Sequence, residues 1–342
     1  MIMNRIKLAR QAHCYSLQDL ADILSQKTLS VTRATLSHYE NGRIQPTEKT
    51  LIVLSRALGV TRPFFDKEDW TDFSLQFQHC PAIRTEKLRQ ELYSYLQIEL
   101  ERYLDIDSLL GLHSAWLPPD KTEIEGEDVY KIEEIVSYAR SFLKAGGIQV
   151  ASVCTMLENS GWYLLCLPPF FGGVDNLSGV ENSHNMPFLT YKIHTYSDDF
   201  RLQLLKELGY FFLRSDDEQS LKGYTEQFAR AFLMPRELAV ADFGRHRSRI
   251  SYSELSNAKM RYGMGRVEIL KRLLELEIIT TEHFDEFYAY IDQHAYISRE
   301  SAMGDDIRYY EAPASYKNKV SRAYSEGLID RDSEHVLPEW HR

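Results

Sequence analysis

The N-terminal segment constrains the fold most, because its residue pattern predicts a series of short helices with defined ends. Apolar residues recur at helical spacing in residues 2–13, and the next segment begins at Ser16, a residue type that caps helix N-termini. A third segment starts at Thr32 and ends at Gly42, where glycine commonly closes a helix. Residues 48–60 form a fourth amphipathic pattern. The sequence therefore predicts a small all-helical domain.

Charge is distributed unevenly along the chain. Residues 1–65 hold nine Lys and Arg against four Asp and Glu, so this part carries +5 and the remainder −15. A basic N-terminal segment on an acidic protein favours an anionic partner, and nucleic acid is the obvious candidate. On charge alone, a chance fluctuation over a short segment explains the pattern equally well.

Composition limits the remaining possibilities. The chain has 342 residues, 44% of them hydrophobic, which is enough for two or three domains. It contains no run of about 20 apolar residues and no signal-peptide pattern, so we expect no membrane span and a cytoplasmic location. The four scattered cysteines predict reduced thiols rather than a disulfide framework.

The N-terminal motifs resemble a Cro/CI-type (XRE) helix-turn-helix domain. The matching residues are Leu20-Ala21, Tyr39-Glu40-x-Gly42, Pro46 and Ala57-Leu58-Gly59-Val60. In that family the second helix of the pair enters the major groove of double-stranded DNA, usually as a homodimer on paired half-sites. The resemblance implies base contacts by Arg33, Ala34, Ser37 and His38, and phosphate contacts near Thr32, Asn41 and Arg43.

One feature departs from that family. Residues 25–31 (Ser25 to Val31) make the turn between the paired helices longer than the motif needs. The insertion either re-angles the recognition helix or simply lengthens the loop. A helical interaction domain that binds no DNA is the alternative for the whole segment.

The middle of the chain predicts a mostly α protein with a small α+β domain. Residues 66–84 lack clear periodicity and are expected to form a linker or an irregular segment, followed from Thr85 by a long amphipathic helix that packs on the next domain or on a second subunit. Residues 162–168 and 187–193 have strand-type apolar runs. The expected domains are 1–66 (helix-turn-helix), 67–128 (linker and long helix), 129–280 (α+β) and 281–342 (helical).

Residues 130–280 resemble an ImmA/IrrE-type, zincin-like metallopeptidase domain. The resemblance rests on "ENSG" at 158–161, "PFLTYKI", "DDFRLQLLKELGYFFL" and "EQFARAFLMP". In that family a helix carries His-Glu-x-x-His, whose histidines bind zinc while the glutamate activates a zinc-bound water. A third ligand is an acid on the next helix.

All three implied zinc ligands are replaced in this sequence. Lys206 and Tyr210 occupy the histidine positions, and Tyr224 aligns with the third ligand. An ammonium has no lone pair and a phenol is a poor ligand unless ionised. Glu207 alone is kept, and Glu226 is expected to point away, because two helical residues span about 200°. His184, His194 and His246 lack the paired spacing that would rebuild the site.

These patterns favour a DNA-binding regulator, expected to be a repressor, with no metal, no cofactor and no catalytic activity. The degenerate peptidase-like domain would then serve as a sensor of a small-molecule signal or as a module that binds a protein partner. Two alternatives stay open: an antitoxin or partner-binding protein that regulates its own operon, and an active metallopeptidase that cleaves a repressor.

Overall fold

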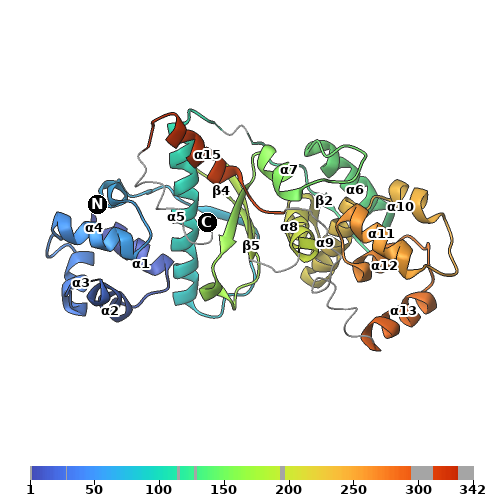
Figure 1. Ribbon diagram of the computed structural model, residues 1–342, viewed down its shortest axis with the longest axis horizontal. Helices are drawn as coiled ribbons and strands as arrows, with labels where there is room; N and C mark the ends of the chain where they lie inside the picture. Colours follow the sequence, from blue (N-terminus) through green and yellow to red (C-terminus); the bar gives the residue numbers. More distant parts are fainter. Residues whose placement is uncertain are drawn as a thin grey trace.

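The computed structural model describes residues 2–27, 29–113, 116–126, 129–192, 197–293 and 311–329. The molecule is elongated (Figure 1), with a helical domain at one end, a small sheet and one long helix in the middle, and a cluster of helices at the other end. This arrangement confirms a mostly helical protein that contains a small sheet.

The N-terminal helices lie where the sequence predicts them. They are α1 (Ile2–Ala12), α2 (Leu17–Gln26), α3 (Arg33–Glu40), α4 (Glu48–Ala57) and the 3-10 turn η1 (Arg62–Asp66). Ser16 caps α2 by accepting a hydrogen bond from the Asp19 backbone N–H at 3.1 Å, and the Asp19 carboxylate accepts one from the Ser16 N–H at 2.7 Å. At α3 and α4 the Thr32 and Thr47 side chains accept from the Thr35 and Thr50 N–H groups, so local sequence sets the start of each helix.

The predicted long helix, α5 (Glu86–Leu109), joins the N-terminal domain to the sheet. On one side it packs against α1, where the buried Arg5 guanidinium donates to both oxygens of Glu101 at 2.9 and 2.6 Å. On the other side the Tyr95 hydroxyl donates to the Cys166 carbonyl on the sheet. Within this chain the apolar stripe of α5 is therefore covered by the neighbouring domains.

The sheet has four strands, β1 (Leu75–His79), β3 (Tyr163–Leu167), β4 (Ser178–Glu181) and β5 (Met186–Lys192), in the order β1-β4-β5-β3. The pairs β1–β4 and β4–β5 are antiparallel, and β3–β5 is parallel. The expectation of an irregular segment at 66–84 was wrong for β1. Its alternating sequence, Leu-Gln-Phe-Gln-His, adds an edge strand, and the Phe77 ring packs 6.3 Å from that of Phe188.

Helices cover both faces of this sheet. Along β3, Tyr163, Leu165 and Leu167 join the core beneath α5, whereas Leu164 and Cys166 join the core of the second helical cluster. That cluster contains α6 (Val129–Phe142), α7 (Val153–Asn159), α8 (Ser197–Phe212), α9 (Glu218–Leu233), α10 (Arg236–Phe243), α11 (Tyr252–Tyr262), α12 (Arg266–Glu275) and α13 (Thr281–Gln293). Two short segments, β2 (Thr122–Glu123) and β6 (Leu213–Arg214), pair in parallel, and η2 (Pro169–Phe171) follows β3.

A glycine lets α8 and α9 approach closely. A Cβ at Gly209 would lie 3.1 Å from the Thr225 Cγ2 atom and 3.3 Å from the Phe228 ring. Real Cβ contacts are rarely so tight, so a side chain at this position would push the helices apart. This contact also fixes which residues of α9 face α8.

The last described helix, α15 (Ser315–Ser325), returns to α5. Its N-terminal N–H groups at Ala314 and Ser315 donate to the Glu158 carboxylate at 3.0 and 2.9 Å, and Lys319 lies 2.6 Å from Asp107 of α5. The expected helical C-terminal region is thus seen in α13 and α15, and residues 294–310 and 330–342 lie outside the described ranges. All four cysteines are free, and no helix in the described part is long and apolar enough to cross a membrane.

Candidate nucleic-acid interface and a charged cavity

The recognition helix α3 is held against α1 by its last residues. Tyr39 is buried in the domain core, and the Glu40 carboxylate accepts two hydrogen bonds from Arg10, at 2.6 and 2.9 Å. Arg10 also donates to the Tyr15 carbonyl at 2.6 Å. Gly42 then leaves the helix with a φ of +68°, a conformation that glycine adopts without strain. The Tyr-Glu-x-Gly motif therefore orients α3 and ends it.

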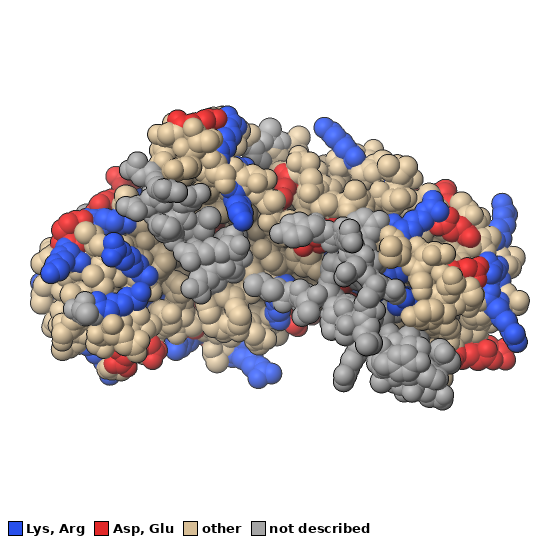
Figure 2. All heavy atoms as spheres, in the orientation of Figure 1, with Lys and Arg blue, Asp and Glu red and all other residues tan. Residues whose placement is uncertain are grey.

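The opposite side of α3 is open to solvent. Arg33 and Ala34 are exposed, and Ser37 and His38 are half-buried. Arg33 and Arg43 are exposed and form no ion pair with another described residue. Figure 2 shows Lys and Arg side chains gathered over the helix-turn-helix end of the molecule, among fewer acidic ones. The base-contacting set predicted from sequence thus lies on one accessible helix at the basic end.

Two of the predicted phosphate-contacting residues also have structural roles. The Thr32 hydroxyl accepts from the Thr35 backbone N–H at 3.2 Å, which caps α3. The Asn41 amide donates to the Ser37 carbonyl at 2.7 Å. Both side chains remain exposed, so they mark the two ends of the helix at the surface.

The insertion between the paired helices is absorbed without separating them. Its first two residues, Ser25 and Gln26, extend α2 by part of a turn. Leu29 and Val31 then fold back and pack on the core of the domain, and the Leu29 N–H donates to the Leu24 carbonyl at 3.0 Å. The longer turn is therefore a packed loop.

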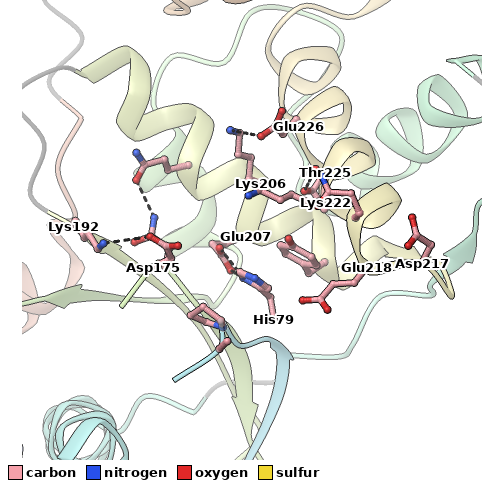
Figure 3. Close-up of a pocket in the computed structure, with 16 residues that line it drawn as sticks. His79, Asp175, Lys192, Lys206, Glu207, Asp217, Glu218, Lys222, Thr225 and Glu226 are labelled. Atoms are coloured by element: carbon pink, nitrogen blue, oxygen red, sulfur yellow. Dashed lines mark hydrogen bonds and ion pairs between the residues drawn. The ribbon is translucent and has the colours of Figure 1, made fainter. Parts of the chain in front are cut away.

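A polar cavity of about 970 Å³ lies between the sheet, α8 and α9 (Figure 3). Its wall carries five carboxylates and three ammonium groups, as well as one imidazole and one phenol. The lining residues that bear charge or can bear it are His79, Asp175, Lys192, Lys206, Glu207, Tyr210, Asp217, Glu218, Lys222 and Glu226.

Glu207 lines this cavity beside His79, a residue that the sequence did not point to. The His79 Nδ1 atom lies 3.1 Å from each oxygen of Glu207, and the imidazole stacks on the Tyr210 ring at 4.2 Å with an interplanar angle of 6°. The Glu207 side chain is only 7% exposed and that of His79 is 22% exposed. His79 ends β1 within the unassigned segment, and only the alternation of Leu75 and Phe77 hinted at a strand there.

Glu226 corrects the sequence analysis. It was expected to point away, but it lines the cavity and accepts a hydrogen bond from Lys206 at 3.2 Å. Tyr224 instead turns to the other side of α9, where its hydroxyl donates to the Gly126 carbonyl at 2.9 Å. The contact at Gly209 sets this rotation of α9, so Lys222, Thr225 and Glu226 face the cavity. Of the four positions that the metallopeptidase resemblance assigns to a metal site, Lys206, Glu207 and Tyr210 come together and Tyr224 does not.

The donor set in this cavity does not fit a zinc ion. Lys206 is an ammonium paired with Glu226, and burial raises the pKa of the Tyr210 phenol above its ordinary value, which keeps it neutral. Besides Lys206 and Tyr210, the groups in direct contact at Glu207 leave His79 and Glu207 itself, two donors where zinc sites use at least three protein ligands. Within the described ranges, no three His, Cys, Asp or Glu side chains converge as a metal site. His184 contacts Trp70, His246 is exposed, and His194 lies outside the described residues.

Comparison with known proteins bears on the N-terminal domain. The helix-turn-helix family profile matches residues 6–65. A SPbeta prophage-derived uncharacterized HTH-type transcriptional regulator, YonR, from Bacillus subtilis (strain 168) is 32% identical over 113 residues, which is all of that protein and 30% of this chain. No solved structure matches the chain significantly. With the exposed recognition helix and its Tyr-Glu-x-Gly anchor, these matches show that the chain belongs to the HTH-type, DNA-binding transcriptional regulators.

Proposed function

We propose that this protein is a repressor that binds its operator as a homodimer and whose sheet-and-helix body senses a signal or binds a partner without catalysing proteolysis. The observation that carries the regulatory role is α3, anchored by Arg10 and Glu40, with Arg33 exposed at its N-terminal end. Residues at the start of such a helix read base edges, and each bidentate contact from arginine to guanine contributes about 1–3 kcal/mol of discrimination.

The proposal for the body rests on the cavity. A peptidase of the zincin type needs a metal-bound water, and the groups around Glu207 are a paired lysine, a neutral phenol and one histidine. The cavity nevertheless persists as an open, charged space of about 970 Å³, a size that suits ligand recognition. A cavity that lacks zinc-binding side chains supports a role in recognition without catalysis.

Selection of binding sites from a random DNA pool, followed by fluorescence anisotropy with the full chain, tests the regulatory role. Arg33→Ala should weaken binding to the selected sequence by about tenfold to a hundredfold and relax its sequence preference. Lys317→Ala removes an exposed cation from α15, away from α3, and should leave the affinity unchanged. Recovery of no enriched sequence, or binding that ignores sequence at every salt concentration, would refute the proposal.

Metal analysis of the purified chain tests the non-catalytic body. We expect less than stoichiometric zinc, and no change in folding when chelator is added. One zinc per chain, with proteolysis that disappears in Glu207→Gln, would instead favour the active metallopeptidase. A stoichiometric protein that copurifies with the chain would favour the antitoxin reading, which is compatible with operator binding.

A further inference from the structure

We propose that the cavity beside Glu207 binds a guanidinium group, which displaces the His79 ring from its contacts with Glu207 and Tyr210. This inference rests on the proposed function of the body as a recognition module, and it names the chemistry that is recognised. It is built from three observations: the geometry of His79, the polar atoms left over in the cavity wall, and the balance of charge.

His79 shows which contacts a ligand would make. Its flat ring lies 4.2 Å from that of Tyr210 with an interplanar angle of only 6°, and its Nδ1 atom bridges both Glu207 oxygens at 3.1 Å. A guanidinium is also planar, stacks on aromatic rings, and donates two parallel hydrogen bonds to one carboxylate. It can therefore stack on Tyr210 and donate hydrogen bonds to Glu207 at the same time, and it carries a permanent charge that imidazole lacks.

Acceptors are among the unpaired polar groups of the cavity wall. Asn176 donates through its Nδ2 atom to Gln203 at 2.9 Å, and its buried Oδ1 atom has no hydrogen-bond partner among the described residues. Glu218 lines the same space and is exposed, with no ion pair to another described residue. A group with several N–H donors and no acceptor complements such a wall, and guanidinium has five.

The charge of the wall also favours a cation. Five carboxylates face the cavity against three ammonium groups, and two of those ammonium groups are already paired, Lys206 with Glu226 at 3.2 Å and Lys192 with Asp175 at 3.6 Å. Lys222 is exposed and lines the same cavity (Figure 3), as the third ammonium group. Neither Glu207 nor Glu218 is paired with a described lysine or arginine, so an anionic ligand would meet their carboxylates, whereas a guanidinium would pair with one of them.

Displacement of His79 is feasible because of where it lies. It is the last residue of the edge strand β1, and its side chain is 22% exposed at the cavity wall. β1 belongs to the segment that joins η1 of the DNA-binding domain to α5 (Figure 1). A ligand that replaces His79 as the hydrogen-bond partner of Glu207 would therefore release the end of β1, the strand that follows the DNA-binding domain in the chain.

Isothermal titration of the full chain without DNA tests the proposal. The probes are three capped pentapeptides, Gly-Gly-X-Gly-Gly, in which X is arginine, its neutral isostere citrulline, or glutamate. We expect the arginine peptide to bind at least about tenfold more tightly than the citrulline peptide, and the glutamate peptide not to bind. This comparison uses the unchanged protein, so misfolding cannot confuse it. Equal binding of arginine and citrulline, or no binding of arginine, overturns the proposal.

Variants then locate the site. Glu207→Gln should weaken binding of the arginine peptide by about 30-fold, and Glu218→Gln, at an exposed position of the cavity wall, should weaken it severalfold. Glu134→Gln should have no effect, because Glu134 is an exposed residue of α6 outside the cavity. His79→Ala should tighten binding roughly severalfold, because the ligand no longer displaces an internal competitor. Equal effects of the cavity variants and Glu134→Gln overturn the assignment.

The free compound agmatine distinguishes two sources of the group. Binding of agmatine as tight as that of the arginine peptide assigns the site to a small guanidinium compound, and tighter binding of the peptide assigns it to a polypeptide partner. Both results support the guanidinium site. Operator selection is measured without any of these probes, so failure of the guanidinium site and failure of DNA recognition are distinguishable.

Discussion

The clamp between Arg10 and Glu40 should control the stability and the function of the recognition helix. The two side chains are 12% and 7% exposed, and two hydrogen bonds of 2.6 and 2.9 Å join them. Removing one member of a buried ion pair costs about 3–5 kcal/mol. Glu40→Gln keeps the shape and one acceptor, so we expect about 3 kcal/mol, which corresponds to roughly two powers of ten in the local opening equilibrium.

Hydrogen exchange followed by mass spectrometry measures this loss of local stability directly. Peptides that cover α3 should exchange about a hundredfold faster in Glu40→Gln, and affinity for the selected operator should fall with them. Glu48→Gln is the matched control, because Glu48 pairs with Arg62 at 2.7 Å but is 64% exposed. Such surface pairs contribute about 0–1 kcal/mol. If both variants change exchange equally, the clamp does not hold α3 as the structure implies.

Three further outcomes are expected. Gly263→Ala should destabilise the chain by about 2 kcal/mol more than Gly111→Ala in denaturant titrations: the two glycines have similar positive φ, +60° and +65°, but only a Cβ at Gly263 collides with the guanidinium of the buried Arg201, and equal losses would contradict this. Burial lowers the pKa of His13, so the unfolded chain binds this proton more readily, and stability should fall as the pH drops from about 6.5 towards the lowered folded value. Melting curves of His13→Gln between pH 5 and 8 should lose that part of the slope, and an unchanged slope would exclude His13 as its source. Asn41→Ala should weaken the end of α3 by about 1 kcal/mol, seen as faster exchange confined to its last turn, because the amide bond to the Ser37 carbonyl is lost.

Local sequence signals define the helices of the N-terminal domain. Ser16, Thr32 and Gly42 act through hydrogen bonds and backbone angles within a few residues, so their effect is readable without the fold. The identity of Lys206 is equally local, since an ammonium cannot bind zinc wherever it lies. These short-range facts carried the DNA-binding prediction and the expectation that the metal site is lost.

The surroundings of Glu207, in contrast, depend on long-range packing. His79 reaches it across 128 positions of sequence, through a strand whose pairing with β4 no local pattern specifies. The rotation of α9 depends on its contact with Gly209, so Glu226 faces the cavity and Tyr224 does not, the reverse of the alignment-based expectation. Helical periodicity gives the angle between two residues of one helix, but packing against a neighbouring helix decides which of them turns inward.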